Sequence, residues 1–207
     1  MSNFNNDLEK EIILSQYLDI IYRKMNFNFI RVHDLTEQNQ GIDVIIKHGL
    51  KEYKIDEKAQ LHYLNKDLPT FTFETSYLKN NNLKRGWLYD ENKLTDYYFL
   101  ITAIKLKNYK YELTSPNDIE SLKITSVKRS RLIELLNSKG IDEEKVIKYD
   151  NQIREQETYG KNPISELDKI SEGQFFYTET LVEKPINIQF RLNFLIQEGV
   201  AKKINYD

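Results

Sequence analysis

An aspartate pair and a lysine occur at a spacing that could support metal-dependent hydrolysis. Asp43 lies in the mostly apolar stretch 41–46, and Asp56 and Lys58 lie two residues apart in the stretch 53–60. Because side chains alternate along a strand, Asp56, Lys58 and Gln60 share one face if this stretch is extended. A hairpin of the two stretches would bring Asp43 beside Asp56. Two neighbouring carboxylates repel each other unless a proton or a cation lies between them.

A hard divalent cation would relieve that repulsion, because Mg²⁺ and Mn²⁺ prefer oxygen ligands. Lys58 beside the cation could orient or help to deprotonate an attacking water, and could offset the negative charge of a phosphate. Activation of water together with stabilisation of charge on phosphorus is the chemistry of phosphodiester hydrolysis. The three side chains therefore predict a metal-dependent phosphodiesterase site.

Periodicity and turn residues predict the elements that would position this site. Residues 7–25 have helical spacing, with Asp7 as the N-cap and with Glu9 and Glu11 in the first turn. Residues 33–40 are expected to form a loop, and His48-Gly49 predicts a turn between two strands. Strands are expected at residues 27–32, 42–46, 51–59, 70–75, 86–89 and 95–104.

The C-terminal part is expected to be mostly helical. A helix is predicted over 126–138, capped by Ser126, and another from Asp142 onward. Residues 186–196 alternate like a strand but follow Pro185 and precede Gly199, and helix is favoured. The predicted class is α/β (α+β), with a core over residues 1–115 and a C-terminal addition over residues 116–207, which could also pack on the core as one domain.

In this setting the sequence resembles the PD-(D/E)XK nuclease superfamily, which includes many restriction endonucleases and archaeal-type Holliday-junction resolvases. The resemblance consists of Gly41-Ile42-Asp43, a hairpin, and Asp56-Glu57-Lys58 as the (D/E)-x-K motif. It covers about half of the chain, roughly residues 7–104. It implies a restriction-endonuclease-like core, a mixed β-sheet flanked by helices.

The resemblance also implies roles for individual residues. Asp43 and Asp56 would hold Mg²⁺, with Mn²⁺ as a substitute, and Lys58 would assist the water. Many members carry an acid on the first helix in a Glu-x-Glu-apolar-apolar setting, which residues 9–13 match. Glu9 is favoured as this ligand and catalytic residue because it matches the first Glu, and Glu11 is the alternative.

Three features depart from the commonest form of the motif or leave its register open. Ile42 stands where Pro is frequent, and Asp56 stands where Glu is more frequent. If the strand contained a bulge, Glu57 could be the ligand in place of Asp56. Gln60 matches a polar residue that some members carry after the motif.

Composition excludes several other classes of protein. The 207 residues have a net charge of -2 and no Cys, which excludes a histone-like binder, a disulfide scaffold and thiolate zinc sites. No apolar run is long enough to span a membrane, and no signal peptide is recognised, so a cytoplasmic protein is expected. His33, His48 and His62 lack metal-binding spacing and are expected to be solvated. Nucleotide-binding Gly-rich motifs and a Gly-x-Ser-x-Gly elbow are absent.

DNA is the expected partner, and the protein is expected to be an endonuclease of phage, mobile-element or restriction type. Cations interleaved with aromatic residues could contact phosphates and unpaired bases; they occur at residues 79–93, 105–111 and 123–131. Cleavage of two strands would favour a homodimer. The alternative is a non-catalytic DNA- or protein-binding module with a nuclease-like fold. An RNA or repair nuclease with the same core would share the chemistry.

Overall fold

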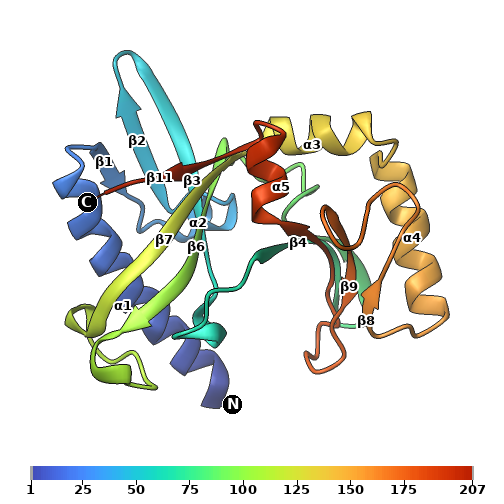
Figure 1. Ribbon diagram of the computed structural model, residues 1–207, viewed down its shortest axis with the longest axis horizontal. Coiled ribbons are helices and arrows are strands. Elements are labelled where there is room, and N and C mark those ends of the chain that lie inside the picture. The colour runs from blue at the N-terminus through green and yellow to red at the C-terminus, as the bar shows by residue number, and fades with distance from the viewer. Residues whose placement is uncertain (1, 207) are drawn as a thin grey trace. The chain divides into compact units, whose positions relative to one another are not determined.

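The chain divides into two units, each with its own sheet, in the computed structural model, which describes residues 2–206 (Figure 1). Unit 1 comprises Met1–Leu68, Thr95–Ser126 and Lys202–Asp207, and unit 2 comprises Pro69–Leu94 and Val127–Ala201. The fold is mixed α/β, as expected. The division differs from the expected boundary at residue 116, because part of unit 2 is inserted between two strands of unit 1.

Unit 1 is built on a six-stranded mixed sheet with the order β1-β2-β3-β6-β7-β11. Neighbours among β1, β2 and β3 are antiparallel, whereas β3 and β6 are parallel. The strands are β1 (Asn28–Arg31), β2 (Val44–His48), β3 (Lys51–Ala59), β6 (Tyr97–Leu106), β7 (Ile119–Lys128) and β11 (Ala201–Ile204). The first four lie where strands were expected, and β6 is almost wholly buried, as a central strand should be.

Helix α1 (Ser2–Lys24) covers one face of this sheet (Figure 1). Its Leu14, Leu18 and Ile21 recur at helical spacing and are buried against Val44 and Ile55 of the sheet. The helix begins five residues before the expected start at residue 7. The expectation of an N-cap at Asp7, with Glu9 and Glu11 in the first turn, is therefore wrong.

A second correction concerns residues 33–40, which were expected to form a loop. They contain the short helix α2 (Leu35–Asn39), whose N-cap is Asp34. The Asp34 carboxylate accepts hydrogen bonds from the backbone N–H groups of Thr36 and Glu37 at 2.8 and 3.0 Å. This cap satisfies donors that the first turn of a helix otherwise leaves unpaired.

Unit 2 contains a five-stranded antiparallel sheet with the order β5-β4-β10-β9-β8. Its core is aromatic, with the Phe73 ring 6.0 Å from that of Phe190 and 5.5 Å from that of Trp87. The strands are β4 (Thr70–Lys79), β5 (Asn82–Arg85), β8 (Gly160–Asn162), β9 (Gly173–Tyr177) and β10 (Ile186–Arg191); the helices are α3 (Arg129–Ser138), α4 (Glu143–Glu155) and α5 (Leu192–Gln197).

Several boundaries in the second half of the chain differ from expectation. The expected strand over residues 86–89 is absent, and residues 87–89 form a turn. Residues 126–128 end β7, so Ser126 does not cap α3. Asp142 does cap α4, as expected. The ambiguous stretch 186–196 is a strand followed by a helix. From residue 116 onward, five strands accompany three α-helices.

None of the helices in residues 2–206 is both long enough and apolar enough to pass through a membrane.

Candidate active site

The β2–β3 hairpin brings Asp43 opposite Asp56. The register pairs Val44 with Ile55, so the preceding residue, Asp43, faces Asp56 across the hairpin. The Asp43 N–H donates to the Ile55 carbonyl at 2.8 Å, and the Asp43 carbonyl accepts from Val32 N–H at 2.9 Å. The backbone of Asp43 is thus held from both neighbouring strands, which fixes the origin of its side chain.

Asp56 and Lys58 lie on one face of β3 and contact each other. Lys58 Nζ is 2.8 Å from Asp56 Oδ1, and the Asp56 side chain is only 3% exposed, while that of Lys58 is 31% exposed. Asp56 Oδ2 is buried and has no hydrogen-bond partner among the described residues. A buried carboxylate oxygen without a partner is costly. The lysine therefore satisfies only half of this carboxylate.

The carboxyl group of Asp43 titrates abnormally because of its surroundings. Burial, and then the nearby charge of Asp56, raise the pKa of Asp43 to about 7, against the opposing effect of Lys58. Asp43 Oδ2 also accepts a hydrogen bond from the backbone N–H of Glu57 at 2.7 Å. Asp43, Asp56 and Lys58 thus form one electrostatically coupled group, which we call the aspartate-lysine cluster.

The acids of α1 relate differently to this cluster. Burial is the main cause that raises the pKa of Glu11; Lys58 opposes the shift and Asp7 adds to it. Glu11 therefore lies within the electrostatic reach of Lys58, although it keeps exposed surface. Glu9, the favoured candidate, is exposed. Because α1 begins at Ser2, favourable charge in the first turn no longer explains either acid.

Glu57 points to the opposite face of β3, as alternation requires. Its Oε1 accepts from the Tyr22 hydroxyl at 2.6 Å, and its Oε2 is 2.5 Å from Arg31 Nη1. Arg31 also binds Asp19 through Nε and Nη2 at 2.9 and 2.6 Å. We call these four residues the arginine network. The alternative in which Glu57 replaces Asp56 as a metal ligand would require this network to open.

The arginine network was not predicted from the sequence. Its members lie as many as 38 positions apart, from Asp19 to Glu57, and no local spacing relates them. Arg31 in a short strand and Tyr22 on the apolar side of a helix were the only signals. Gln60, the remaining candidate, is partly buried at the end of β3, and its N–H donates to the Ile101 carbonyl at 3.0 Å.

The donor set of the aspartate-lysine cluster fits a hard divalent cation. Mg²⁺ is commonly held by one or two carboxylates together with water and substrate oxygens. Asp56 Oδ2 is a buried oxygen to which no described residue donates, and the charge of Asp56 repels that of Asp43. No group of three or more His, Asp or Glu side chains is arranged to hold a metal within residues 2–206. Asp43 and Asp56 are therefore the two carboxylates that the described structure brings together here.

The remaining polar candidates do not join the aspartate-lysine cluster. His33, His48 and His62 are exposed, as expected. Several cations of the basic stretches bind groups of the protein itself. Arg129 donates to the carbonyls of Leu88, Asp90 and Lys93. Other cations form the ion pairs Lys110–Asp118, Lys123–Asp67, Arg85–Glu91 and Arg85–Glu143. These stretches do not single out a surface for DNA.

Comparisons of the chain with family models, with curated proteins and with solved structures find no match. The resemblance to PD-(D/E)XK nucleases therefore depends on the motif and its predicted elements alone. The geometry of the aspartate-lysine cluster is the structural basis for a proposed function.

Proposed function

We propose that this protein is a metal-dependent deoxyribonuclease that hydrolyses DNA phosphodiester bonds at the aspartate-lysine cluster. The observation that carries the proposal is the state of Asp56. One oxygen of this buried carboxylate contacts Lys58, and the other has no partner within the described part of the chain. A second aspartate, Asp43, lies opposite, and its pKa is raised to about 7. Strongly shifted, incompletely satisfied acids are more frequent at functional sites than elsewhere.

The proposed roles follow from the contacts. Asp43 and Asp56 would bind Mg²⁺, or Mn²⁺ in its place, and the backbone N–H of Glu57 orients Asp43 through Oδ2. A divalent ion bound there supplies Lewis-acid stabilisation of charge on a phosphate. Lys58 reaches solvent and can donate to a phosphate oxygen or to the attacking water. Glu11 or Glu9 would complete the site from α1.

The substrate class comes from the motif resemblance. An endonuclease of phage, mobile-element or restriction type is the reading we favour, acting in the cytoplasm and, for cleavage of both strands, as a homodimer. The type of endonuclease, its location and its dimeric state are thus separate parts of the proposal, in addition to hydrolysis.

The test is cleavage of supercoiled plasmid DNA with Mg²⁺, with Mn²⁺ and with EDTA. We expect nicked or linear products with either metal and none with EDTA. Asp56→Asn and Lys58→Met should each lower the rate at least about 100-fold, because each removes a group that acts on the reacting phosphate. Circular dichroism would verify that both variants remain folded.

A matched control lies on the same strand. Glu52 of β3 is exposed and pairs with Lys47 at 2.8 Å, outside the cluster. Glu52→Gln removes one negative charge, as Asp56→Asn does, and should leave cleavage unchanged. Full activity of folded Asp56→Asn protein would refute the assignment.

One observation favours a different function, a non-catalytic binding module. The Lys58 ammonium already neutralises part of the charge on Asp56, and no third acidic ligand joins the pair in the described residues. Such a module would bind DNA or protein without cleavage under any metal. Its binding, measured by gel shift on DNA or by pull-down of a protein partner, would persist in Asp56→Asn.

A further inference from the structure

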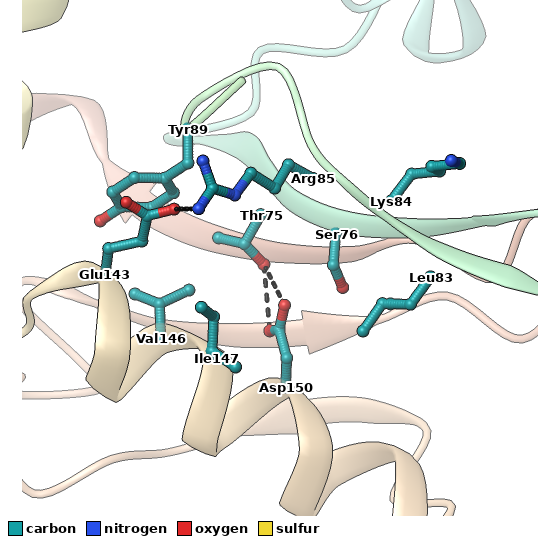
Figure 2. Close-up of a pocket in the computed structure, with 10 residues that line it drawn as sticks. All are labelled: Thr75, Ser76, Leu83, Lys84, Arg85, Tyr89, Glu143, Val146, Ile147 and Asp150. Carbon is teal, nitrogen blue, oxygen red and sulfur yellow. Dashed lines mark hydrogen bonds and ion pairs between the residues drawn. The ribbon is translucent and has the colours of Figure 1, made fainter. Parts of the chain in front are cut away.

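A second group of polar side chains lines a cavity in unit 2, between strands β4 and β5 and helix α4 (Figure 2). The cavity has a volume of about 170 Å³. A cavity of about 150 Å³ is known to accept benzene, so this space suits one six-membered ring with small substituents. Leu83, Val146 and Ile147 provide apolar walls, as is usual in small-ligand pockets.

The cavity contains a buried acceptor, the carboxylate of Asp150, which is 3% exposed. Thr75 Oγ1 lies 3.1 and 3.3 Å from the two oxygens of this carboxylate (Figure 2). The same hydroxyl also lies 3.0 Å from the Ile186 carbonyl oxygen. The Thr75 hydroxyl has a single hydrogen and cannot serve all three acceptors fully. The Ser76 hydroxyl adds one more donor.

Asp150 therefore keeps the capacity to accept further hydrogen bonds. A carboxylate offers about four acceptor positions, of which two hydroxyl hydrogens fill at most two. Burial is the first cause that raises the pKa of this group to about 6. A ligand with an N–H group would supply the missing donor inside the cavity.

A cation, Arg85, lines the β5 side of the cavity. It pairs with Glu91 at 2.7 Å and with Glu143 at 3.0 Å, so acids of the protein already balance its charge. The neighbouring Lys84 is exposed, and its ammonium group points away from the cavity, as alternation along β5 requires (Figure 2). The lining thus combines a ring-sized apolar space with an N–H acceptor.

We propose that this cavity binds the cytosine base of a nucleotide, with the amino group of the base donating to Asp150. Cytosine and thymine are the one-ring bases of DNA. Cytosine presents an amino donor, which carboxylates accept, whereas thymine presents a carbonyl acceptor at the same position. The base could belong to a free nucleotide or to an unpaired position of a single strand.

This inference uses other residues than the aspartate-lysine cluster, and it can be tested without catalysis. Isothermal titration in EDTA would compare dCMP with dTMP, and then oligo-dC with oligo-dT. We expect the cytosine ligand to bind about tenfold tighter or more than its thymine counterpart. A preference shown by dCMP identifies a free nucleotide as sufficient, and a preference shown only by the oligonucleotide identifies the strand as the source.

Two variants locate the binding. Asp150→Asn keeps the shape of the side chain but adds a donor, and should remove the preference for cytosine over thymine. Lys84→Gln is the matched control, because this side chain points away from the cavity (Figure 2), and it should leave the preference for cytosine unchanged. Thermal melting of each variant would verify folding. Equal affinity for the cytosine and thymine ligands, or an unchanged preference in folded Asp150→Asn protein, would overturn the proposal.

Discussion

The two faces of strand β3 carry buried acids in opposite states. On one face, both oxygens of Glu57 are bound, by Tyr22 and Arg31. On the other, Asp56 has one oxygen on Lys58 and the other without a partner among residues 2–206. The two acids are consecutive residues of β3, so both lie in the same stretch of extended backbone. The contrast separates a buried acid that the protein satisfies from one that it leaves incomplete, and the proposed function depends on the second.

The difference has a physical basis. A buried polar network that is fully satisfied orders the structure, and one that is half satisfied costs stability unless a ligand completes it. The arginine fork on the Glu57 face presents several fixed donors, whereas the single ammonium group of Lys58 serves two aspartates. We therefore expect the arginine network to stabilise the fold, and the proposed function requires the aspartate-lysine cluster.

The largest expected effect breaks the satisfied face. Arg31→Met leaves Glu57 buried without its cation, at 10% side-chain exposure, and should lower the free energy of unfolding by about 3–5 kcal/mol. Urea unfolding followed by circular dichroism measures the loss. Adding Glu57→Leu to this variant should recover much of it, because an apolar pair needs no charge partner. A loss below about 1 kcal/mol would remove the distinction between the faces.

On the face of β3 that carries Asp56, a substitution should raise the free energy of unfolding, whereas Arg31→Met lowers it. Because the pKa of Asp43 is raised to about 7 from 3.8, its folded form binds a proton more readily than its unfolded form. In EDTA, the stability it contributes is fully present below about pH 4 and is lost as pH rises through about 7. At pH 8, Asp43→Asn should therefore be more stable than the wild type, by about 2 kcal/mol.

The same Asp43→Asn protein should be inactive. Stability curves of both proteins at several pH values would show the advantage disappear in acid. Lower stability of the variant at pH 8 would mean that Asp43 is a structural residue, like Glu57.

Metal addition should complete the unsatisfied face. Mg²⁺ at ten times its dissociation constant should stabilise the wild type by about 1.4 kcal/mol, through preferential binding to the folded state. Differential scanning fluorimetry with Mg²⁺ and with Mn²⁺ measures the shift. Asp56→Asn should show none, and an equal shift in that variant would place the cation elsewhere.

The smallest expected effect is at an exposed ion pair, which shows how little a solvated charge contributes to stability. The exposed Lys47–Glu52 pair joins β2 and β3 of the same hairpin. Exposed pairs contribute little because both charges are well solvated when apart. Glu52→Gln should therefore change the unfolding free energy by less than about 0.5 kcal/mol at any pH above 5, as measured by urea titration.

The hairpin and its acid pair were predictable from the sequence because their signals are local. Alternation along residues 51–59 and the turn at His48-Gly49 set the strand and its faces. Since the turn determines the register, it also set Asp43 opposite Asp56. The N-cap of α2 had a signal as well, Asp34 followed three residues later by Glu37, which was overlooked.

Other features could not be predicted from local patterns. The apolar residues of β7 are spaced unevenly, at 119, 122, 124 and 127, so neither a helical nor a strand period stands out. Ser126 imitates a helix cap but lies inside that strand. The arginine network depends on contacts between distant segments. The division into units depends on which strands pair, and a segment that pairs elsewhere, residues 69–94, interrupts unit 1.

This interruption has a consequence for how the protein is made. Strand β3 cannot pair with its parallel neighbour β6 until β4, β5 and then β6 have been synthesised. Strand β7 cannot pair with β11 until the chain has reached residue 204. Sheets with such distant pairings fold slowly and leave strand edges open meanwhile. A nascent chain that stalls before residue 201 would expose the β7 edge, and chaperone dependence during synthesis should therefore be greatest late in translation.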